Sequence, residues 1–285
     1  MANDQVASSA ACLRDVENAA PSAQQDCSDV IHISVFFDGT GNNKDLDEPT
    51  RKWSNVARIW RAAQQMVKPG SPNYTVYVSG VGTPFNGKPL FAGDEKAIAL
   101  EDSALMGAAG GAGGARRLNF GQQQINDALR GALLGKARTL GGQVAQYANA
   151  GQQQSFSDVN KALGRHRLIK QINVSIYGFS RGAALARAFC NQWLWQCKES
   201  RGQLSYEGYP IRFVFLGLFD TVASFGLPAT NTANTLQYGG FKGRDLVVDE
   251  RVERCVHYVA AHELRFSFPV DLIRRDGALS GDWLE

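Results

Sequence analysis

The segment Gly178-Phe179-Ser180-Arg181-Gly182 places a serine where nucleophilic chemistry would need it. It lies between a β-branched apolar run, Ile169 to Tyr177, and a stretch with helical spacing, Arg181 to Trp195. A serine on a sharp strand-to-helix turn exposes its Oγ at the sheet edge, and glycines two residues to either side let strand and helix approach. The first helical amide, that of Arg181, would point at an oxyanion. A plain turn with capping glycines is the alternative, but the position between strand and helix favours a nucleophile.

A candidate acid follows the apolar run Ile211 to Phe219, which has the pattern of a buried strand. Asp220 ends this run and comes after Ser180, in the chain order serine, acid, histidine. Its role would be to orient an imidazole and to stabilise the imidazolium. An aspartate that opens a loop and caps its own turn is the alternative. We predict that Asp220 is the acid of the site.

The base is the open member of this constellation. The sequence contains four histidines, at His32, His166, His257 and His262. Only the last two follow Asp220, and both fall within Val252 to Leu264, where we predict a helix. The base of such a site normally stands on a loop after a strand, and a helical histidine is more often a packed residue. His257 is the better candidate of the two, but spacing alone does not complete a triad.

The elements that must position these residues can be read from apolar runs and turn signals. The predicted strands are Ile31–Phe37, Tyr74–Val78, Ile169–Tyr177 and Ile211–Phe219, and the predicted helices are Asn55–Met66, Phe120–Leu134 and Arg181–Trp195. Within the last helix we expect Ala184, Leu185, Ala188 and Trp195 to face inward. Apolar strands that alternate with helices indicate an α/β fold with a mostly parallel sheet and helices on both faces.

The first predicted strand ends in a dense turn signal, Asp38-Gly39-Thr40-Gly41-Asn42-Asn43. Asp38 precedes the serine in the chain and is therefore less suited to be the acid. We expect this turn to bring backbone amides to the site instead. Gly39 is the predicted second element of an oxyanion hole.

Composition limits the function classes. The chain has 285 residues and a net charge of only +3, which gives no support for a nucleic-acid partner. Five cysteines without a C-x-x-C pair argue against a zinc site and a disulfide framework, so we expect reduced structural thiols. The glycine-rich stretch 107–114 lacks the Lys-Ser/Thr of a phosphate-binding loop. We expect no metal and no organic cofactor.

The N-terminal residues 1–29 read as a polar tail, and residues 30–285 as the α/β domain. The tail lacks the apolar segment of a signal peptide, and no stretch reaches the ~18–20 apolar residues of a transmembrane segment. We therefore expect a chain made as a soluble cytoplasmic protein. The cationic stretch Arg165 to Lys170 could meet anionic lipid, although a solvated surface is the simpler interpretation.

These motifs together resemble the catalytic domain of the Tle-type phospholipase effectors of bacterial type VI secretion, an α/β-hydrolase family. The resemblance covers residues 31 to about 269, in the family's order. It rests on the segments Phe36–Asn43, Gly80–Thr83, Gly178–Ala183 with Ala186-Arg187, and Gly217–Ser224. The Asp-Gly-Thr-Gly-Asn and Gly-Phe-Ser-Arg-Gly elements are specific in combination.

The resemblance implies Ser180 as nucleophile and Asp220 as acid. It also implies a phospholipid or related lipid ester as substrate, delivery to a target cell by type VI secretion, and partners of the secretion-spike and immunity-protein classes. The family's helix with a histidine, an acidic residue and an arginine matches His257, Glu263 and Arg265. The family's base belongs to a later segment, which nothing up to Glu285 matches.

Two interpretations of this gap are open. The sequence is a fragment of a longer effector, which we expect, so that its catalytic domain is truncated at the C-terminus. Alternatively, it is an incomplete, non-catalytic module that keeps the hydrolase-like fold and binds a partner. Another serine hydrolase on the same fold, such as a carboxylesterase or a peptidase, is a further alternative for the substrate class.

Overall fold

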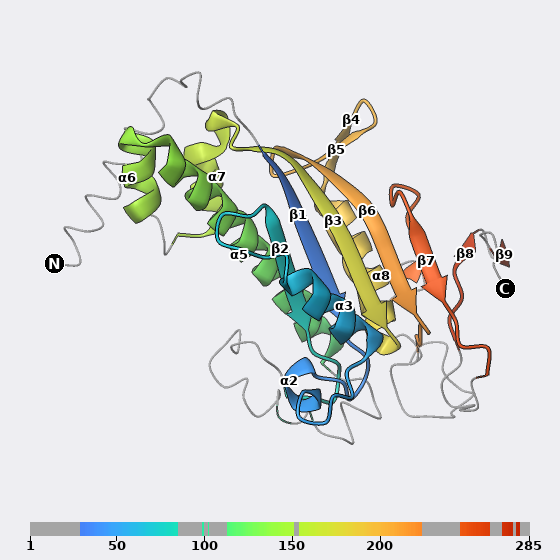
Figure 1. Cartoon of the computed structure of the whole chain (residues 1–285). Coiled ribbons are helices and arrows are strands. Elements are labelled where there is room, and N and C mark those ends of the chain that lie inside the picture. The colour runs from blue at the N-terminus through green and yellow to red at the C-terminus, as the bar shows by residue number, and fades with distance from the viewer. Residues whose placement is uncertain are drawn as a thin grey trace.

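The structure is a computed structural model that describes residues 29–84, 99, 102, 113–150, 154–223, 246–262, 270–275 and 278–279. The predicted tail, apart from its last residue, and most of the glycine-rich stretch lie outside the described residues. Within them the predicted α/β fold is confirmed. It is α/β-hydrolase-like, with a mostly parallel central sheet and helices on both faces (Figure 1).

The sheet is built around five parallel strands, β1 (Asp29–Phe37), β2 (Asn73–Val78), β3 (Ile169–Phe179), β6 (Tyr209–Phe219) and β7 (Cys255–Tyr258). They lie side by side in the order β2-β1-β3-β6-β7. An antiparallel hairpin of β4 (Lys198–Ser200) and β5 (Gln203–Tyr206) pairs with the start of β6. A short pair, β8 (Arg274–Arg275) and β9 (Ala278–Leu279), completes the described strands.

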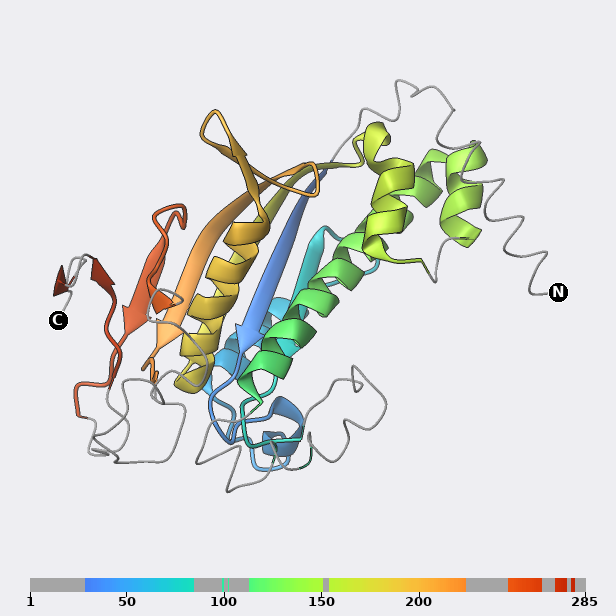
Figure 2. The same ribbon diagram turned by 180° about the vertical axis from the view of Figure 1, so that it is seen from behind.

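The longer helices cover the two faces of this sheet. The helix α3 (Asn55–Gln64) packs on one face, and α5 (Gly114–Leu140) and α8 (Arg181–Gln196) pack on the other (Figure 2). The helices α6 (Gly142–Ala150) and α7 (Phe156–Leu163) both contact α5. The 3₁₀ turn η4 (Gly164–His166) directly follows α7. The short α2 (Lys44–Asp47) lies near the carboxyl ends of the strands. The core therefore forms two layers, one on each side of the central strands.

Four predicted strands and three predicted helices are present, with boundaries that differ by a few residues. The central strands are apolar because both their faces are covered. In β1 the side chains of Ile31, Val35 and Phe36 are completely buried. Because both faces are buried, these strands are nearly continuous apolar runs, and this pattern allowed them to be predicted from the sequence.

The predicted helix over Val252 to Leu264 is wrong. Residues Cys255–Tyr258 form β7, which pairs in parallel with Leu216–Phe219 of β6. Val252 adds an isolated parallel bridge to Phe213. The edge of β6 offers backbone groups that need partners, and pairing with this long-range edge outweighs the local helical pattern.

The expected inward orientation of Trp195 is also wrong, because that side chain is 61% exposed. Trp193 is the buried indole of α8, and it packs edge-on against Tyr206 and Phe213. It lies four residues after Phe189 and so shares its helix face, whereas the residue two positions later points to the other side. Ala184, Leu185 and Ala188 are buried as expected.

Candidate active site

Parallel register brings the predicted site residues to one edge of the sheet. Phe37 pairs with Gly178, so Asp38 and Ser180 both leave the sheet at the carboxyl ends of neighbouring strands. Phe179 pairs with Phe219, which places Ser180 and Asp220 directly after aligned residues of β3 and β6. The carboxyl edge therefore holds the candidate nucleophile between the two candidate acidic residues.

Ser180 occupies a strained turn between β3 and α8. Its φ of 55° and ψ of −125° lie in a region that residues with a Cβ rarely adopt, at a cost of about 1–3 kcal/mol. Backbone bonds hold this conformation: the Ser180 amide donates to the Phe219 carbonyl at 2.8 Å, and the Ser180 carbonyl accepts from Ala183 at 3.0 Å and Val222 at 3.2 Å. The side chain is partly exposed. The serine is thus presented at the edge by a rigid turn.

The glycines on either side of Ser180 are required by close backbone contacts. A Cβ on Gly178 would lie 2.5 Å from the Cα of Ala183 in the first turn of α8. A Cβ on Gly182 would lie 2.3 Å from the Asp38 carbonyl oxygen. Both distances are shorter than any real Cβ contact, and the colliding atoms belong to the backbone. The sequence expectation for these glycines is confirmed, and the second contact also joins the elbow to the turn after β1.

Asp38 organises that turn from the inside. Its carboxylate is 1% exposed and accepts hydrogen bonds from the Gly39 amide at 2.7 Å, the Ser54 hydroxyl at 2.6 Å and the Tyr77 hydroxyl. Burial raises the pKa of Asp38, and the bonds from Ser54, Tyr77 and Gly39 act in the opposite direction. Ser54 caps α3 and Tyr77 lies on β2, so the Asp38 carboxylate joins the turn after β1 to these two neighbouring elements.

The turn also contacts the residue that follows the candidate nucleophile. The guanidinium of Arg181 is 2% exposed and donates from Nε to the Thr40 hydroxyl at 2.7 Å. Burial lowers the pKa of Arg181 to about 10, so it keeps its charge at neutral pH. Because the Gly39 amide already donates to Asp38, the amide of Thr40 is the one in the Gly39–Asn42 stretch that lacks an acceptor among the described residues.

Asp220 follows β6 in a left-handed conformation, with φ of 44°. Its amide donates to the Tyr258 carbonyl at 2.8 Å, and its Oδ1 accepts from the Ala260 amide. No donor among the described residues bonds its other oxygen. The carboxylate is therefore held from the β7 side and has one oxygen that could orient an imidazole.

His257 lies beside this carboxylate, on β7 rather than on the predicted helix. Its Nε2 accepts a hydrogen bond from the Thr221 amide at 3.2 Å. Burial and the nearby Arg187 lower the pKa of His257 to about 4, against the opposing charges of Asp220 and Asp271. A neutral imidazole whose Nε2 holds the backbone after Asp220 acts as a structural acceptor here.

The other three histidines lie on different elements. His32 is exposed on β1, where it pairs with Asn73 at the start of β2, and His166 is buried in η4. His262 is exposed in the turn after β7. None of them makes a hydrogen bond to Ser180 or Asp220 within the described part of the chain. Glu263 and Arg265, which the family pattern pairs with His257, lie outside the described residues.

Arg187 is a residue that sequence reasoning missed as a site element. Its buried side chain donates from Nε to the Leu246 carbonyl at 2.5 Å and forms an ion pair with Asp271 at 2.8 Å. The Asp271 amide in turn donates to the Thr221 carbonyl at 2.7 Å. Arg187 thus ties α8 to two distant segments, and one of them, at Asp271, bonds the residue after Asp220. Its place about two helical turns after Ser180 was visible in the sequence, but its partners were not.

The described residues contain no cluster of histidine, cysteine and carboxylate side chains that could hold a metal ion. Cys190, Cys197 and Cys255 are free thiols, and burial raises the pKa of all three, to about 11 for the last two. Cys12 and Cys27 lie outside the described residues. Among the described helices, none has the length and hydropathy to cross a bilayer.

Comparison with known proteins finds a family model that matches part of the chain. Residues 191–282 match the model of the type VI secretion phospholipase effector, Tle1-like, catalytic domain. No curated protein shows a significant match. The matched part begins after Ser180 and includes Asp220 and His257.

Two solved structures are similar to the chain. One is an uncharacterized protein from Pseudomonas aeruginosa, with 28% identity and a TM-score of 0.62 over 98% of this chain and 42% of that chain. The other is the Tle1 effector bound to the VgrG spike of the type 6 secretion system, with 20% identity and a TM-score of 0.39 over 87% of this chain and 48% of that chain. The chain thus spans less than half the length of either. The resemblance drawn from the motifs is confirmed by the match of residues 191–282 to the catalytic domain of the Tle1-like phospholipase effectors.

Proposed function

We propose that the chain is the core of a serine hydrolase that cleaves an ester bond of a phospholipid or related lipid. The observation that carries this proposal is the strained Ser180 turn at the carboxyl edge, one strand away from Asp220. The family match supports the lipid substrate class. The reaction needs neither a metal nor an organic cofactor.

In this mechanism the Ser180 Oγ attacks the ester carbonyl while a histidine accepts its proton. Asp220 orients that imidazole and stabilises its cation through Oδ2, the carboxylate oxygen that does not bond the Ala260 amide. The tetrahedral oxyanion is held by the Arg181 amide and by the turn at Gly39, whose available donor is the Thr40 amide because the Gly39 amide bonds Asp38. Such donors contribute about 3–4 kcal/mol each. The intermediate then breaks the ester C–O bond, and the imidazolium gives its proton to the oxygen of the departing alcohol. Water, deprotonated by the same imidazole, attacks the acyl-enzyme, and the carboxylic acid leaves while Ser180 regains its proton.

The base is proposed to lie on a segment that follows Glu285 in a longer protein. His257 is the alternative in the present chain, but its Nε2 is engaged by the Thr221 amide. A base must present a free nitrogen within hydrogen-bond reach of the serine hydroxyl. We therefore propose that His257 supports the acid loop and that the 30–285 domain is completed by that later segment.

The proposed biological setting follows from the family match alone. The chain would be made in the cytoplasm of the producing cell and delivered by type VI secretion to a target cell. A spike component and an immunity protein would be its partners, and the hydrolysis of target lipids its effect.

The test is ester turnover by the full-length protein, including any residues that follow Glu285. Ser180→Ala is expected to lower kcat by at least about 10³-fold without changing the fold, because no other group can form the acyl-enzyme. Ser205→Ala on the β5 hairpin is the matched control and is expected to keep full activity. Turnover that survives in Ser180→Ala would refute the assignment.

A second candidate function is a non-catalytic module that keeps the hydrolase-like fold and binds a partner. The observation in its favour is that none of the four histidines bonds Ser180 or Asp220 in the described part of the chain. A fluorophosphonate probe separates the two candidates, since only an activated serine reacts with it. Headgroup and chain-length profiles then separate a phospholipase from a carboxylesterase or peptidase.

A further inference from the structure

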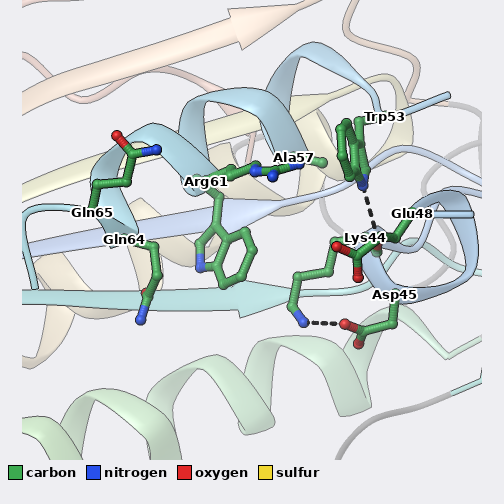
Figure 3. A pocket seen from close by; sticks show the side chains of 9 residues that line it. Lys44, Asp45, Glu48, Trp53, Ala57, Arg61, Gln64 and Gln65 are labelled. Atoms are coloured by element: carbon green, nitrogen blue, oxygen red, sulfur yellow. Dashed lines mark hydrogen bonds and ion pairs between the residues drawn. The ribbon is translucent and has the colours of Figure 1, made fainter. Parts of the chain in front are cut away.

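A cavity of about 320 Å³ opens between α2 and α3 (Figure 3). Ser180 is not among the residues that line it. Its walls include two indoles, Trp53 and Trp60, and two cations, Lys44 and Arg61. The carboxylates of Asp45 and Glu48 lie at the α2 end. A volume of this size is at the lower limit of ordinary small-ligand sites.

The two cations are held against aromatic rings. The Lys44 Nζ lies 4.7 Å from the centre of the Trp60 ring and 5.6 Å from that of Tyr77. The Arg61 Cζ lies 4.5 Å from the centre of the Trp53 ring. Such stacking fixes a cation without neutralising it. The Arg61 charge, for which no ion pair is found among the described residues, therefore remains available to an anion at the cavity. Lys44 also pairs with Asp45, which is 57% exposed and so screened by water.

The surroundings of the cavity are basic and partly apolar. Residues 44–68 contain six basic and three acidic side chains. Leu46 on α2 and Met66 after α3 are 58% and 63% exposed. Indoles, exposed apolar side chains and an excess of Lys and Arg are the combination found where proteins lie on a membrane surface.

The cavity is connected to the carboxyl edge that presents Ser180. The Lys44 amide donates to the Tyr77 hydroxyl at 2.9 Å, and that hydroxyl donates to Asp38. Figures 1 and 2 both place α2 near the carboxyl ends of the central strands. A surface that docks on α2 and α3 would therefore lie beside the edge at which the serine stands.

We infer that the α2–α3 face, defined by Lys44, Trp53, Trp60 and Arg61, docks the protein on an anionic phospholipid membrane. Lys44 and Arg61 bind lipid phosphates in the cavity, and the indoles lie at the headgroup level. This inference rests on the proposed function for its choice of a lipid partner, but the docking itself uses no catalytic residue. An acidic protein segment is the competing occupant.

A second basic stretch provides an internal control. Arg167 and Lys170 are exposed at the amino-terminal start of β3, at the end of the sheet opposite to α2 (Figure 1). No aromatic ring stacks on either cation in the described residues, and neither lines the cavity between α2 and α3. Removing these two charges changes the net charge by the same amount as removing Lys44 and Arg61. Comparing the two double variants therefore distinguishes binding at the α2–α3 cavity from nonspecific attraction between charges.

The test measures co-sedimentation of the chain carrying Ser180→Ala with phosphatidylglycerol vesicles, so that no hydrolysis alters the lipid. Lys44→Gln with Arg61→Gln is expected to weaken binding by at least about tenfold. Arg167→Gln with Lys170→Gln is expected to weaken it by less than about threefold. Lys44→Arg with Arg61→Lys restores both charges and is expected to restore most of the binding, which excludes misfolding as the cause.

Several outcomes would overturn the inference. If both double variants lose the same amount of vesicle binding, the binding is nonspecific charge attraction and the inference fails. Undiminished binding of the Lys44 and Arg61 pair would remove these residues from the interface. Absence of vesicle binding together with binding of an acidic peptide would assign the cavity to a protein partner. Labelling of Ser180 by a fluorophosphonate is measured separately, so failure of docking and failure of the proposed hydrolase are distinguishable.

Discussion

The carboxyl edge of the sheet is held in two different ways on its two sides. On the Ser180 side, short glycine contacts and a buried carboxylate lock the elbow against the turn after β1. On the Asp220 side, segments distant in the chain are tied together through Arg187, Asp271 and the edge strand β7. The first side depends on local backbone geometry, and the second on long-range pairing. The comparison explains why one side was readable from motifs and the other was not.

Gly182→Ala gives the largest expected effect, because the added Cβ collides with the backbone of Asp38. We expect a loss of about 3 kcal/mol of unfolding free energy, measured by urea denaturation. Gly131→Ala on α5 is the control, since nothing lies within 4 Å of its added Cβ. That change should stabilise the chain by about 0.5–1 kcal/mol. Equal effects of the two changes would refute the locked elbow.

Arg187→Met tests the long-range side of the comparison. It removes the ion pair to Asp271 and the donor to the Leu246 carbonyl. We expect a loss of about 2–3 kcal/mol, below the value for a fully buried pair because Asp271 is 28% exposed. Hydrogen exchange should show the added opening in residues 246–258, while the amides of α3 stay protected. Uniform loss of protection over both regions would contradict the division into two sides.

Asp38→Asn tests the buried carboxylate that holds the turn after β1. An amide of the same size can accept from Gly39 or Ser54 but also presents a donor, which conflicts with one hydroxyl. We expect a loss of about 1–2 kcal/mol. Adding Tyr77→Phe removes one of the competing donors, so the double variant should lose less than the sum of the two single variants. Simple additivity would show that the two residues do not act together.

The last prediction concerns the pH dependence of stability that His257 causes. Its pKa is lowered from 6.5 to about 4, so the folded state binds fewer protons than the unfolded chain in this range. The stabilisation by neutral His257 is complete above pH 6.5 and is lost as the pH falls toward about 4. His257→Gln keeps an acceptor for the Thr221 amide but does not titrate. In this variant the urea midpoint should therefore vary less with pH over this range. His262→Gln, at an exposed position, should keep the original profile, and an unchanged slope in His257→Gln would contradict the assignment.

The two sides of the carboxyl edge also differ in how well they could be predicted from the sequence. The Ser180 elbow could be found because a serine between two glycines, a strand and a helix are all local signals. Asp220 could be placed because an apolar run ended there. The strand β7 could not, because its four residues are stabilised by the edge of β6 rather than by their own pattern. The side-chain partners of Asp38 and the partners of Arg187 were equally hidden, since these bonds span 16 to 84 positions in the chain.

The most direct test of the proposed hydrolase is fluorophosphonate labelling of the full-length protein, followed by identification of the modified residue. The proposed function predicts one covalent label on Ser180, at a rate that falls in Asp220→Asn because the base loses its orienting carboxylate. A full-length protein whose Ser180 stays unlabelled would contradict the hydrolase and leave the binding module as the function of this fold.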